Sequence, residues 1–267
     1  MSSFLFNFDE PSPDDPLPSS LNSGGGEDTV LDKTPIVLVP FDLDAPVLTP
    51  PSPDTRLVKP GIYEGGGTIW EASLFLASYL RERPEIFKVA HRVADLGCGA
   101  AILAREALRS GIVRQILLTD LNSDVLYNVA SPLLRSELAE SQERISSRPD
   151  VFLVAGSWNS LNHAIQTHNC LNISMLSEIG CVDLILSSET LYRPSHLPSF
   201  CALLFHLLHP LHGVALLATK RFYYGAELGG GTSAFLSVAS TFKLSAEVIH
   251  SKDDGSAMIL DIIRVVR

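Results

Sequence analysis

Two glycines and two carboxylates form the clearest chemical pattern in this sequence. The run Asp95-Leu96-Gly97-Cys98-Gly99 ends an apolar stretch, and Asp120 ends the next one, 21 residues after Gly99. Because glycine has no Cβ, the chain can turn tightly here and approach a ligand with its backbone. The carboxylate of Asp120 can accept hydrogen bonds from both hydroxyls of a ribose. The spacing therefore predicts a site for a ribose-containing cofactor, and on these features alone a dinucleotide would also fit.

The residues around the two glycines narrow the type of cofactor. In the dinucleotide pattern Gly-x-Gly-x-x-Gly the third glycine lets a helix pack close under a pyrophosphate, but the residue in that position is Ile102. The carboxylate of Asp95 repels phosphates but can order a site for an ammonium or sulfonium centre. This arrangement is typical of enzymes that use S-adenosylmethionine. The alternative is an ordinary turn between a strand and a helix. A P-loop is excluded, because the chain contains neither GxxxxGKS nor GxxxxGKT.

Two tryptophans are candidates for the walls of this site. Trp158 follows the third predicted strand, where its ring could stack on an adenine while Ser157 or a backbone N–H bonds to the base. The alternative for Trp158 is a core aromatic residue. Trp70 and Glu71 follow three glycines, residues 65–67, and would cover the methionine end of the cofactor. Those glycines could instead be a hinge.

The segment KRFYYGAELGGGTSAF, residues 220–235, raises a separate question. It leaves an apolar run through Lys220, Arg221 and three aromatic residues and then places Gly229-Gly230-Gly231 before the next helical stretch. A plain connection needs one or two turn residues. The composition suggests that bare backbone and flat rings are brought up to a ligand, with a flexible crossover loop as the alternative.

Strands and helices alternate along most of the chain, and their order predicts how these residues meet. Strands are expected at residues 92–97, 115–120, 151–156, 182–188 and 213–219, with helices at 101–111, 123–135, about 160–168 and 196–209. Residues 68–71 fit a capping box before a helix that reaches Pro84. Alternation of this kind predicts a parallel α/β sheet, and the runs LSAEVIH and AMILDIIRVV add an antiparallel pair, which makes seven strands. Ligands bind at the carboxyl ends of the strands of such sheets.

The first 60 residues differ in composition from the rest of the chain. They hold 11 of the 17 prolines and carry a net charge of −7, out of −10 for the whole chain. Such a segment buries too little apolar surface to offset its ordering entropy, so residues 1–60 are expected to be a mostly disordered acidic arm and residues 61–267 the domain. Two apolar islands, FLFNF (4–8) and PIVLVPFDL (35–43), could dock as edge strands or be chance clusters. The arm suits basic protein partners or serves solubility.

The remaining composition excludes several classes of protein. No stretch of 18 residues is continuously apolar and the start of the chain lacks a basic leader, so neither a membrane span nor a secretory signal is expected. The four cysteines form no CxxC pair and are expected to be reduced thiols in the cytosol or nucleus. The body has no basic stripe, so no direct nucleic-acid partner is expected. Nothing indicates an oligomer, and a monomer is expected.

With these residues assembled, the sequence resembles the family 16 seven-strand methyltransferases, which modify lysine or histidine side chains of proteins. The run Ser188-Glu189-Thr190-Leu191-Tyr192 is similar to that family's acceptor motif after strand four, and residues 218–235 are similar to an aromatic and glycine-rich segment of its histidine-specific branch. The resemblance covers residues 62–267 and FLFNF. Departures are Ala101, where the family more often has glycine, and a polar insertion at residues 133–150.

The resemblance implies a Rossmann-like sheet of the class I S-adenosylmethionine-dependent methyltransferases, with S-adenosylmethionine as cofactor and no metal. The implied cofactor-binding residues are Trp70, Asp95, Gly97, Gly99, Asp120, Asn122, Ser157, Trp158 and Ser188. The implied catalytic residues are Glu189, Tyr192 and Tyr224, with Tyr223, Tyr224 and the glycine run forming one wall of the substrate channel.

The resemblance also implies a substrate and a place of action. The acceptor is expected to be the tele nitrogen of a histidine in a basic protein of the large ribosomal subunit, in the cytoplasm and nucleus. Methyl transfer from a sulfonium depends mainly on positioning. Glu189 would bond to the far ring N–H, orient the imidazole and stabilise the charge that develops, unless it caps the following helix.

Three other functions compete with this one. A lysine methyltransferase of the same family would differ only in its acceptor pocket. A non-catalytic chaperone for nascent ribosomal proteins would keep the fold without the chemistry. A metal site could form from His206, His209 and His212, although their i, i+3, i+6 spacing lacks a nearby acidic or cysteine partner.

Overall fold

The computed structural model of the protein describes residues 35–42, 65–141, 148–167, 181–224, 229–253, 255 and 258–267. The strands are β1 (Val37–Val39), β2 (Arg92–Leu96), β3 (Gln115–Asp120), β4 (Asp150–Ala155), β5 (Leu184–Ser188), β6 (Val214–Lys220), β7 (Ser245–Lys252) and β8 (Leu260–Val266). The α-helices are α1 (Glu71–Arg81), α2 (Ile102–Arg109), α3 (Ser123–Val125), α4 (Ser131–Glu140), α5 (Trp158–Gln166), α7 (Leu197–Leu207) and α8 (Thr232–Thr241). Short turns of other helix types are η2 (Pro84–Phe87), η3 (Leu126–Ala130) and η4 (Pro194–His196).

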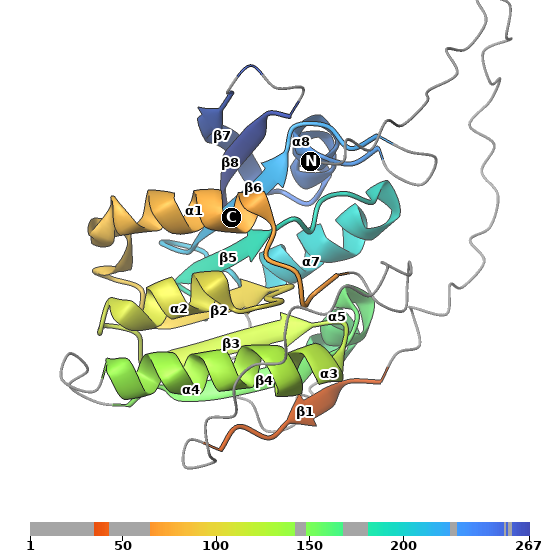
Figure 1. The fold of residues 1–267 in the computed structure, drawn as a ribbon. Helices are drawn as coiled ribbons and strands as arrows, with labels where there is room; N and C mark the ends of the chain where they lie inside the picture. Colours follow the sequence, from red (N-terminus) through yellow and green to blue (C-terminus); the bar gives the residue numbers. More distant parts are fainter. Residues whose placement is uncertain are drawn as a thin grey trace, which may run out of the picture.

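The strands form one mixed sheet in the order β1-β4-β3-β2-β5-β6-β8-β7 (Figure 1). The five strands from β4 to β6 are parallel, whereas β8 runs antiparallel to both β6 and β7. Strands β3 and β4 follow β2 in the sequence and lie on one side of it. The next strand along the chain, β5, lies on the other side of β2, and β6 follows it there. Strand order therefore reverses next to β2, which is where a ligand site is expected in such a sheet. The predicted Rossmann-like mixed sheet is confirmed.

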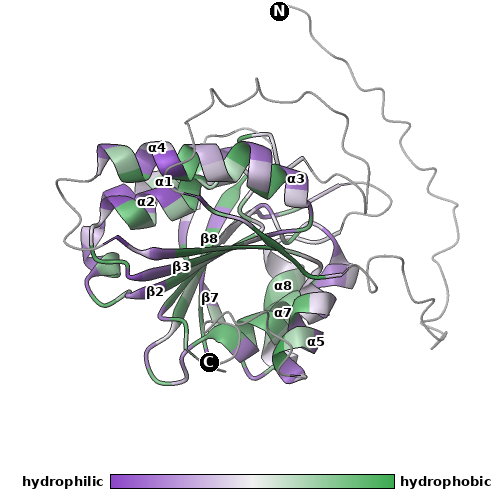
Figure 2. Ribbon diagram, turned by 90° about the horizontal axis from the view of Figure 1, so that it is seen from below, coloured by the Kyte–Doolittle hydropathy of each residue, from purple (hydrophilic) through white to green (hydrophobic). Residues whose placement is uncertain are grey.

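Helices cover both faces of the sheet, as the view along its edge shows (Figure 2). Helices α1, α2 and α4 pack on one face and α5, α7 and α8 on the other. Neighbouring residues of one strand serve opposite cores: Val93 faces α1 and α2, whereas Ala94 faces α5 and α7. Both residues are fully buried. Strands buried on both faces explain why the sequence shows continuous apolar runs rather than alternation.

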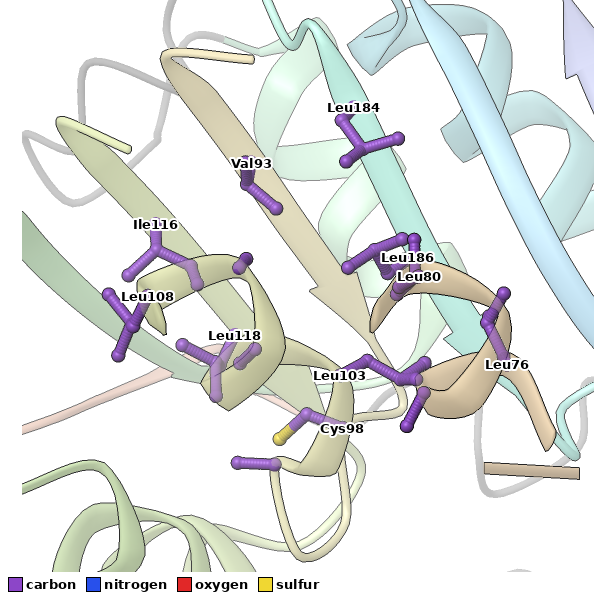
Figure 3. Close-up of a cluster of buried hydrophobic side chains, with 14 of the residues drawn as sticks. Leu76, Leu80, Val93, Cys98, Leu103, Leu108, Ile116, Leu118, Leu184 and Leu186 are labelled. Atoms are coloured by element: carbon purple, nitrogen blue, oxygen red, sulfur yellow. The ribbon is translucent and has the colours of Figure 1, made fainter. Parts of the chain in front are cut away.

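The core on the α1 side lies directly beneath the predicted cofactor loop (Figure 3). Leu76 and Leu80 of α1 pack there with Leu103 of α2, over strand residues such as Leu186. Cys98 lies at the edge of this cluster (Figure 3). The apolar faces of α1 and α2 thus fix the loop between β2 and α2 from below.

The helical stretch after β3 is longer than predicted. The sequence indicated a helix over residues 123–135, but α3, η3 and α4 follow one another without a break to Glu140. The middle segment η3 is a π-helix, and Pro132 lies in the first turn of α4. Proline has no N–H and its ring crowds the preceding turn, so a wider turn before it lets the helix continue.

The polar insertion at residues 133–150 is partly a core element. Its first half belongs to α4, where the buried carboxylate of Glu137 pairs with Arg109 at 2.7 Å and Arg105 at 3.2 Å. Arg109 also pairs with the buried Glu106 at 2.7 Å. Buried carboxylates are tolerated only when paired in this way, so these ion pairs hold α4 against α2.

Strand β1 is an eighth strand that pairs antiparallel with β4 at one edge of the sheet. One apolar island of the N-terminal segment therefore docks as an edge strand, which was one of the two expectations for it. The residue before it, Ile36, lies 3.5 Å from where a Cβ on Gly156 would be, so β1 begins beside the carboxyl end of β4. The other island, FLFNF, and the predicted boundary at residue 60 lie outside the described residues.

The predicted capping box before α1 is wrong. Helix α1 begins at Glu71 with Trp70 in the N-cap position, and no side chain caps it. Thr68 instead belongs to a tight turn, in which its N–H donates to the carbonyl of Gly65 at 2.9 Å. None of the helices in the described ranges has the length and apolar character needed to cross a membrane.

Candidate functional site

A cavity of about 400 Å³ opens at the carboxyl ends of the parallel strands. Its wall is built by the glycine loop after β2, the end of β3, the start of α5, the loop after β5 and the turn before α1. These segments are far apart in the sequence and meet only because parallel strands end at the same edge of the sheet. The reversal of strand order next to β2 leaves the space that the cavity occupies.

Position 97 in the loop after β2 requires glycine for two reasons. Its φ of +70° lies in the left-handed region, which side chains disfavour. A Cβ on it would also lie 2.6 Å from Cγ2 of Thr190, in the loop after β5. The N–H groups of Gly97 and Cys98 donate to the carbonyl of Thr119 at 2.8 and 2.9 Å, which fixes the loop against β3. The bare backbone at Gly97 thus forms part of the cavity wall.

The carboxylate of Asp120 is oriented by two backbone amides. Oδ2 accepts a hydrogen bond from the N–H of Gly99 at 3.1 Å, and Oδ1 accepts one from the N–H of Asn122 at 3.1 Å. A carboxylate oxygen can accept more than one hydrogen bond, so this group has the chemistry to accept from ribose hydroxyls. Asp120 lines the cavity, whereas Asn122 is not among the lining residues and acts on Asp120 through its backbone. The acidic residue is therefore fixed in position before a ligand binds.

Asp95 lies beneath the cavity rather than in its wall. It is 1% exposed, and its Oδ2 accepts a hydrogen bond from the N–H of Ala104, in the first turn of α2, at 3.0 Å. The reason is the pleat of β2, which directs this side chain toward α2. Burial raises the pKa of Asp95 to about 7; the Ala104 hydrogen bond opposes this rise and the charge of Asp120 adds to it. Asp95 thus connects β2 to α2 under the loop.

Ala101 adopts the left-handed conformation, with φ of +54°, as the N-cap residue of α2. This explains why glycine is favoured at the same position in the family that the sequence resembles, since glycine carries no steric cost there. The methyl group is fully buried and does not line the cavity. The departure from the pattern therefore changes the local strain and leaves the ligand-facing wall unaltered.

Ser157 and Trp158, at the start of α5, form another part of the cavity wall. Trp158 lines the cavity and also packs on Phe200 at 5.3 Å between ring centroids, so it borders both the cavity and the core. Ser157 lines the cavity too, but its Oγ accepts a hydrogen bond from the N–H of Ser160 at 3.1 Å and caps α5. Trp158 thus supplies a flat apolar wall, and Ser157 holds the helix that carries it.

The turn before α1 covers the Asp120 end of the cavity. A Cβ on Gly66 would lie 2.9 Å from the side chain of Val125 and 3.5 Å from Oδ2 of Asp120. Trp70 lines the cavity, and its Nε1–H donates to the carbonyl of Gly65 at 3.3 Å. Glu71 is exposed and does not line the cavity, so of the two residues expected to cover the methionine end only Trp70 borders the cavity.

The part of the cavity at the end of β5 is lined by Ser188, Glu189 and Tyr192, and it is called the acceptor end after the motif that these residues resemble. The Oγ atoms of Ser188 and Ser73 lie 2.8 Å apart, within hydrogen-bonding distance, which ties the end of β5 to α1. Glu189 has a φ of +55°, and its N–H donates to the carbonyl of Ala218 at 2.9 Å. A non-glycine residue held in the left-handed region costs energy, and such residues cluster at functional sites.

The aromatic partner of Glu189 is Tyr223 rather than Tyr224. The phenol of Tyr223 donates a hydrogen bond to Oε2 of Glu189, and its ring lies 6.1 Å from that of Tyr192. Tyr224 is 75% exposed and does not line the cavity, so the structure does not place it with the other predicted catalytic residues. The chain bends at Arg221 after β6, and the two neighbouring side chains end in different surroundings, Tyr223 at Glu189 and Tyr224 at the surface.

The carboxyl group of Glu189 has a raised pKa. Burial is the largest cause, and it outweighs the hydrogen bond from Tyr223, the charge of Lys220 and the N–H of Ala72 in α1, all of which lower the pKa. The negative charge of Glu71 raises it further. Burial also raises the pKa of Tyr223, as does the charge of Glu189 beside it. In this pair, therefore, Tyr223 is the proton donor and Glu189 the acceptor.

The glycine run fits the loop after β5 rather than the cavity. A Cβ on Gly230 would lie 2.0 Å from the carbonyl oxygen of Leu191, and the N–H of Gly231 donates to that same carbonyl at 2.7 Å. The N–H of Gly230 donates to the carbonyl of Tyr192 at 3.2 Å. The glycines thus let two loops approach backbone to backbone and hold Tyr192 in place. This contact differs from the predicted channel wall.

Three residues near the site were given no role of their own from the sequence. Lys220 has its Nζ 5.8 Å from the ring centroid of Trp70 and 5.6 Å from that of Tyr223. Thr190 restricts Gly97, and Ser73 contacts the end of β5. Lys220 is the last residue of β6 and Thr190 lies two residues after the end of β5, both at the carboxyl edge of the sheet, so their positions were a usable signal.

The three histidines considered as a metal site do not converge on one point, and each has another contact. Nδ1 of His206 is 2.9 Å from Oδ1 of Asn162, and Nε2 of His212 is 2.9 Å from Oδ1 of Asp183. His209 stacks on His212 at 3.6 Å between centroids. Within the described ranges, no three side chains of the kinds that bind metals come together.

Comparison with known proteins identifies relatives with one shared name. The "Histidine protein methyltransferase 1 homolog" of Bos taurus is 32% identical over 191 residues, 66% of this chain and 48% of the relative. The homolog of Dictyostelium discoideum is 25% identical over 207 residues, 77% and 59% of the two chains. "Histidine protein methyltransferase 1" of Schizosaccharomyces pombe is 30% identical over 198 residues, which cover 66% of this chain and 57% of the relative. The resemblance to the histidine-specific branch is confirmed, and the chain spans about half the length of these relatives.

Solved structures give matches of low similarity. A SAM-dependent methyltransferase from Archaeoglobus fulgidus has a TM-score of 0.45 and 12% identity, over 72% of this chain and 94% of that one. Magnesium protoporphyrin IX methyltransferase from Synechocystis PCC 6803 has a TM-score of 0.47 and 10% identity, over 74% and 82%. No protein-family model matches the chain.

Proposed function

We propose that this chain, a relative of the histidine protein methyltransferase 1 homologs, transfers a methyl group from S-adenosylmethionine to a histidine side chain of a protein. One observation carries the proposal: a single cavity joins the Gly97–Gly99 loop and Asp120 at one end to Glu189 and Tyr192 at the other. The first end has the chemistry to bind an adenosine, and the second has the chemistry to orient a nitrogen nucleophile.

The residues at the first end fit the cofactor. Asp120 offers two oriented carboxylate oxygens to ribose hydroxyls, Trp158 offers a flat wall to an adenine, and Gly97 leaves room where any side chain would clash. When bound, S-adenosylmethionine supplies an electrophilic methyl group on a sulfonium centre. The position of Asp95 beneath the loop gives it a supporting role, holding α2 and the loop at the required distance.

The residues at the second end fit an imidazole acceptor. A nitrogen of the neutral ring forms the new N–C bond with its lone pair while the C–S bond breaks and leaves its electron pair on sulfur. The Glu189 carboxylate accepts a hydrogen bond from the N–H on the far side of the ring, which fixes the tautomer and stabilises the imidazolium that forms. Tyr223 holds Glu189, and Tyr192 provides a ring against the acceptor. The proton on the far nitrogen is lost after transfer.

The substrate in this proposal is a basic protein of the large ribosomal subunit, modified at the tele nitrogen in the cytoplasm or nucleus. Charge supports it: residues 1–60 carry a net charge of −7, which attracts a basic partner. In this proposal the enzyme acts on the protein rather than on nucleic acid, and it acts as a monomer. A lysine methyltransferase remains the competing function, since the same fold and cofactor site would serve it.

The test is to incubate protein extract from cells that lack this gene with the purified protein and labelled S-adenosylmethionine. The labelled product is hydrolysed and separated into methylhistidine and methyllysine. Methylhistidine that disappears with Asp120→Ala and falls with Glu189→Gln supports the proposal. Methyllysine alone would place the activity with the lysine-specific enzymes. Absence of label from a protein that still binds the cofactor would favour a binding role.

A further inference from the structure

We infer that Lys220 is a specificity-determining residue whose ammonium group offsets the charge of Glu189, so that the acceptor end of the cavity takes an uncharged imidazole and disfavours a lysine ammonium. The inference rests on the proposed function and deepens it, because it explains how one carboxylate can serve a histidine acceptor. Lys220 does not line the cavity and takes no part in bond formation.

The position of Lys220 is set by the end of β6. It is the last residue of that strand, and Ala218, two residues earlier, pairs with Ser188 at the end of β5. The side chains of Ala218 and Lys220 point to the same face of the sheet, the face that α1 covers. This brings the ammonium group to the first turn of α1, next to the residue that follows β5, which is Glu189.

Two aromatic rings hold the ammonium group there. Its Nζ lies 5.8 Å from the ring centroid of Trp70 and 5.6 Å from that of Tyr223, within the range of cation–π attraction. Trp70 lines the cavity, and Tyr223 donates its hydroxyl hydrogen bond to Glu189. The rings place the positive charge beside the acceptor end without a direct ion pair. Its charge therefore acts on Glu189 through space and leaves the carboxylate free to bond with a substrate.

Two elements carry charges that act on Glu189. Lys220 on β6 attracts its negative charge and Glu71 on α1 repels it. Arg193 and His196 also line the cavity, and the guanidinium carbon of Arg193 lies 5.6 Å from the Tyr192 ring centroid. Lys220 is therefore the cation that acts on the carboxylate. An incoming lysine ammonium would be repelled by it, and like charges brought together in an interface are strongly unfavourable.

The same charge keeps a bound histidine reactive. A carboxylate next to an imidazole favours the protonated ring, which has no lone pair to attack a methyl group. A positive charge close to the carboxylate weakens this effect, so more of the bound imidazole stays neutral. Removal of the Lys220 charge should therefore both admit lysine and shift histidine methylation to higher pH.

The experiment compares Lys220→Met with Lys220→Arg, which keeps the charge, and with Lys88→Met, a remote exposed lysine after η2. Lys220→Gln serves if the methionine variant does not fold. Each protein is incubated with extract from cells that lack the gene and labelled S-adenosylmethionine, and the ratio of methyllysine to methylhistidine is measured. We expect the ratio to rise about tenfold or more in Lys220→Met, because a like-charge repulsion is removed. Lys220→Arg and Lys88→Met should keep the ratio of the unmodified protein.

A second readout separates selectivity from damage to the fold. The rate of methylhistidine formation is followed as a function of pH, and the affinity for S-adenosylhomocysteine is measured by calorimetry. In Lys220→Met the loss of rate at acidic pH should begin at a higher pH, while the affinity for S-adenosylhomocysteine stays within about twofold.

Each outcome bears on a different statement. If the unmodified protein forms methylhistidine and Lys220→Met changes neither the ratio nor the pH profile, the inference is wrong and the proposed function stands. If the unmodified protein forms mainly methyllysine, the histidine assignment and the inference both fail. If it forms no methylated residue at all, the proposed function fails, and the inference fails with it.

Discussion

The phenol of Tyr223 donates a hydrogen bond to the carboxylate of Glu189 and so links the loop after β6 to the loop after β5. These two loops are separated by α7 and β6 in the sequence, and the hydrogen bond brings them together in space. Their meeting is also secured by Gly230 and Gly231, whose backbone lies on Leu191 and Tyr192. The aromatic and glycine-rich segment after β6 therefore acts on the acceptor end indirectly, by positioning the two residues that face it.

Replacement of Tyr223 by phenylalanine should shift the pH dependence of methyl transfer. The Tyr223 hydrogen bond lowers the pKa of Glu189, which burial has raised above the ordinary value for glutamate. Without the hydroxyl the pKa rises further, and the carboxylate is protonated at a higher pH as the solution is acidified. The acid limb of the kcat profile should therefore move to higher pH, with a loss of about tenfold in kcat at neutral pH. Rates of methylhistidine formation across the pH range measure both effects.

The matched variant for this prediction is Tyr224→Phe. Tyr224 is exposed and its ring contacts Phe222, not Glu189. The acid limb should stay where it is in the unmodified protein. An equal shift in both variants would mean that the hydroxyl of Tyr223 has no special connection to Glu189.

The fold followed from the sequence because its main signals are local. Buried parallel strands give continuous apolar runs, so β2, β3, β4, β5 and β6 could be placed to within two residues. The motif at Asp95 and Asp120 then indicated the edge of the sheet at which the site lies. The helix after β3 was predicted to end at residue 135 rather than Glu140, because the residues that follow read as a polar insertion, and only the ion pairs of Glu137 with Arg105 and Arg109 make them part of the core.

Side-chain direction at the site could not be read from residue types. Tyr223 and Tyr224 are neighbours with the same chemistry, and only the path of the chain after β6 shows which one reaches Glu189. Ser157 offered a hydroxyl to a ligand, but the start of α5 uses that hydroxyl as a cap. The sequence shows Lys220 only as a charged residue at the end of a strand, and its proximity to the ring of Trp70 is visible only in the structure. Each of these depends on contacts between segments that are distant in the sequence.

Replacement of Asp120 by asparagine should weaken cofactor binding by about tenfold, which corresponds to ~1.4 kcal/mol. Both oxygens of Asp120 accept backbone hydrogen bonds, from Gly99 and Asn122. In the variant one oxygen becomes an NH₂ group that faces a backbone N–H, so the side chain must rotate away from the position that suits a ribose. Calorimetry with S-adenosylhomocysteine measures the change. Asp124→Asn, at an exposed position in α3, is the control and should bind as tightly as the unmodified protein.

Replacement of Gly97 by alanine should destabilise the protein, and Thr190→Ser should restore part of the loss. The new Cβ would lie 2.6 Å from Cγ2 of Thr190, and the φ of +70° adds a left-handed cost of about 1–2 kcal/mol. Serine removes the clashing methyl but keeps the hydroxyl that lies 2.8 Å from Oγ of Ser187. Denaturant unfolding should show a loss of about 3 kcal/mol in the single variant and a smaller loss in the double variant. Equal losses would mean that backbone strain alone makes Gly97 necessary.

Replacement of Arg221 by methionine should destabilise the protein at neutral pH by about 2 kcal/mol, because it leaves a fully buried carboxylate short of partners. Asp261 is 0% exposed and accepts hydrogen bonds from Nε and a terminal nitrogen of Arg221 at 3.0 and 2.7 Å. It also accepts hydrogen bonds from Thr232 and Ser251, each at 2.7 Å. Arg221 begins the loop that carries Tyr223, so the same contact anchors the acceptor end to β8.

The deficit should depend on pH in a defined direction. Burial by itself raises the pKa of Asp261, but the hydrogen bonds from Arg221, Ser251 and Thr232 outweigh it and hold the pKa below the ordinary value of 3.8. The contribution of Asp261 to stability is therefore present above that value and is lost only as the pH falls below it. In Arg221→Met the effect of burial prevails, the pKa rises, and protonation relieves the buried charge as the pH is lowered from 7. The difference in the free energy of unfolding between the two proteins should thus be smaller at pH 5 than at pH 7.

Arg264→Met is the comparison that makes this prediction specific to burial. Arg264 pairs with Glu247 at 3.3 Å, and both side chains are largely exposed. Exposed pairs of this kind contribute at most about 1 kcal/mol and often nothing measurable. Urea unfolding at pH 5 and pH 7 should show a small and pH-independent change for Arg264→Met beside the larger, pH-dependent loss for Arg221→Met. A constant deficit for Arg221→Met at both pH values would show that its loss acts through side-chain packing and not through the charge on Asp261.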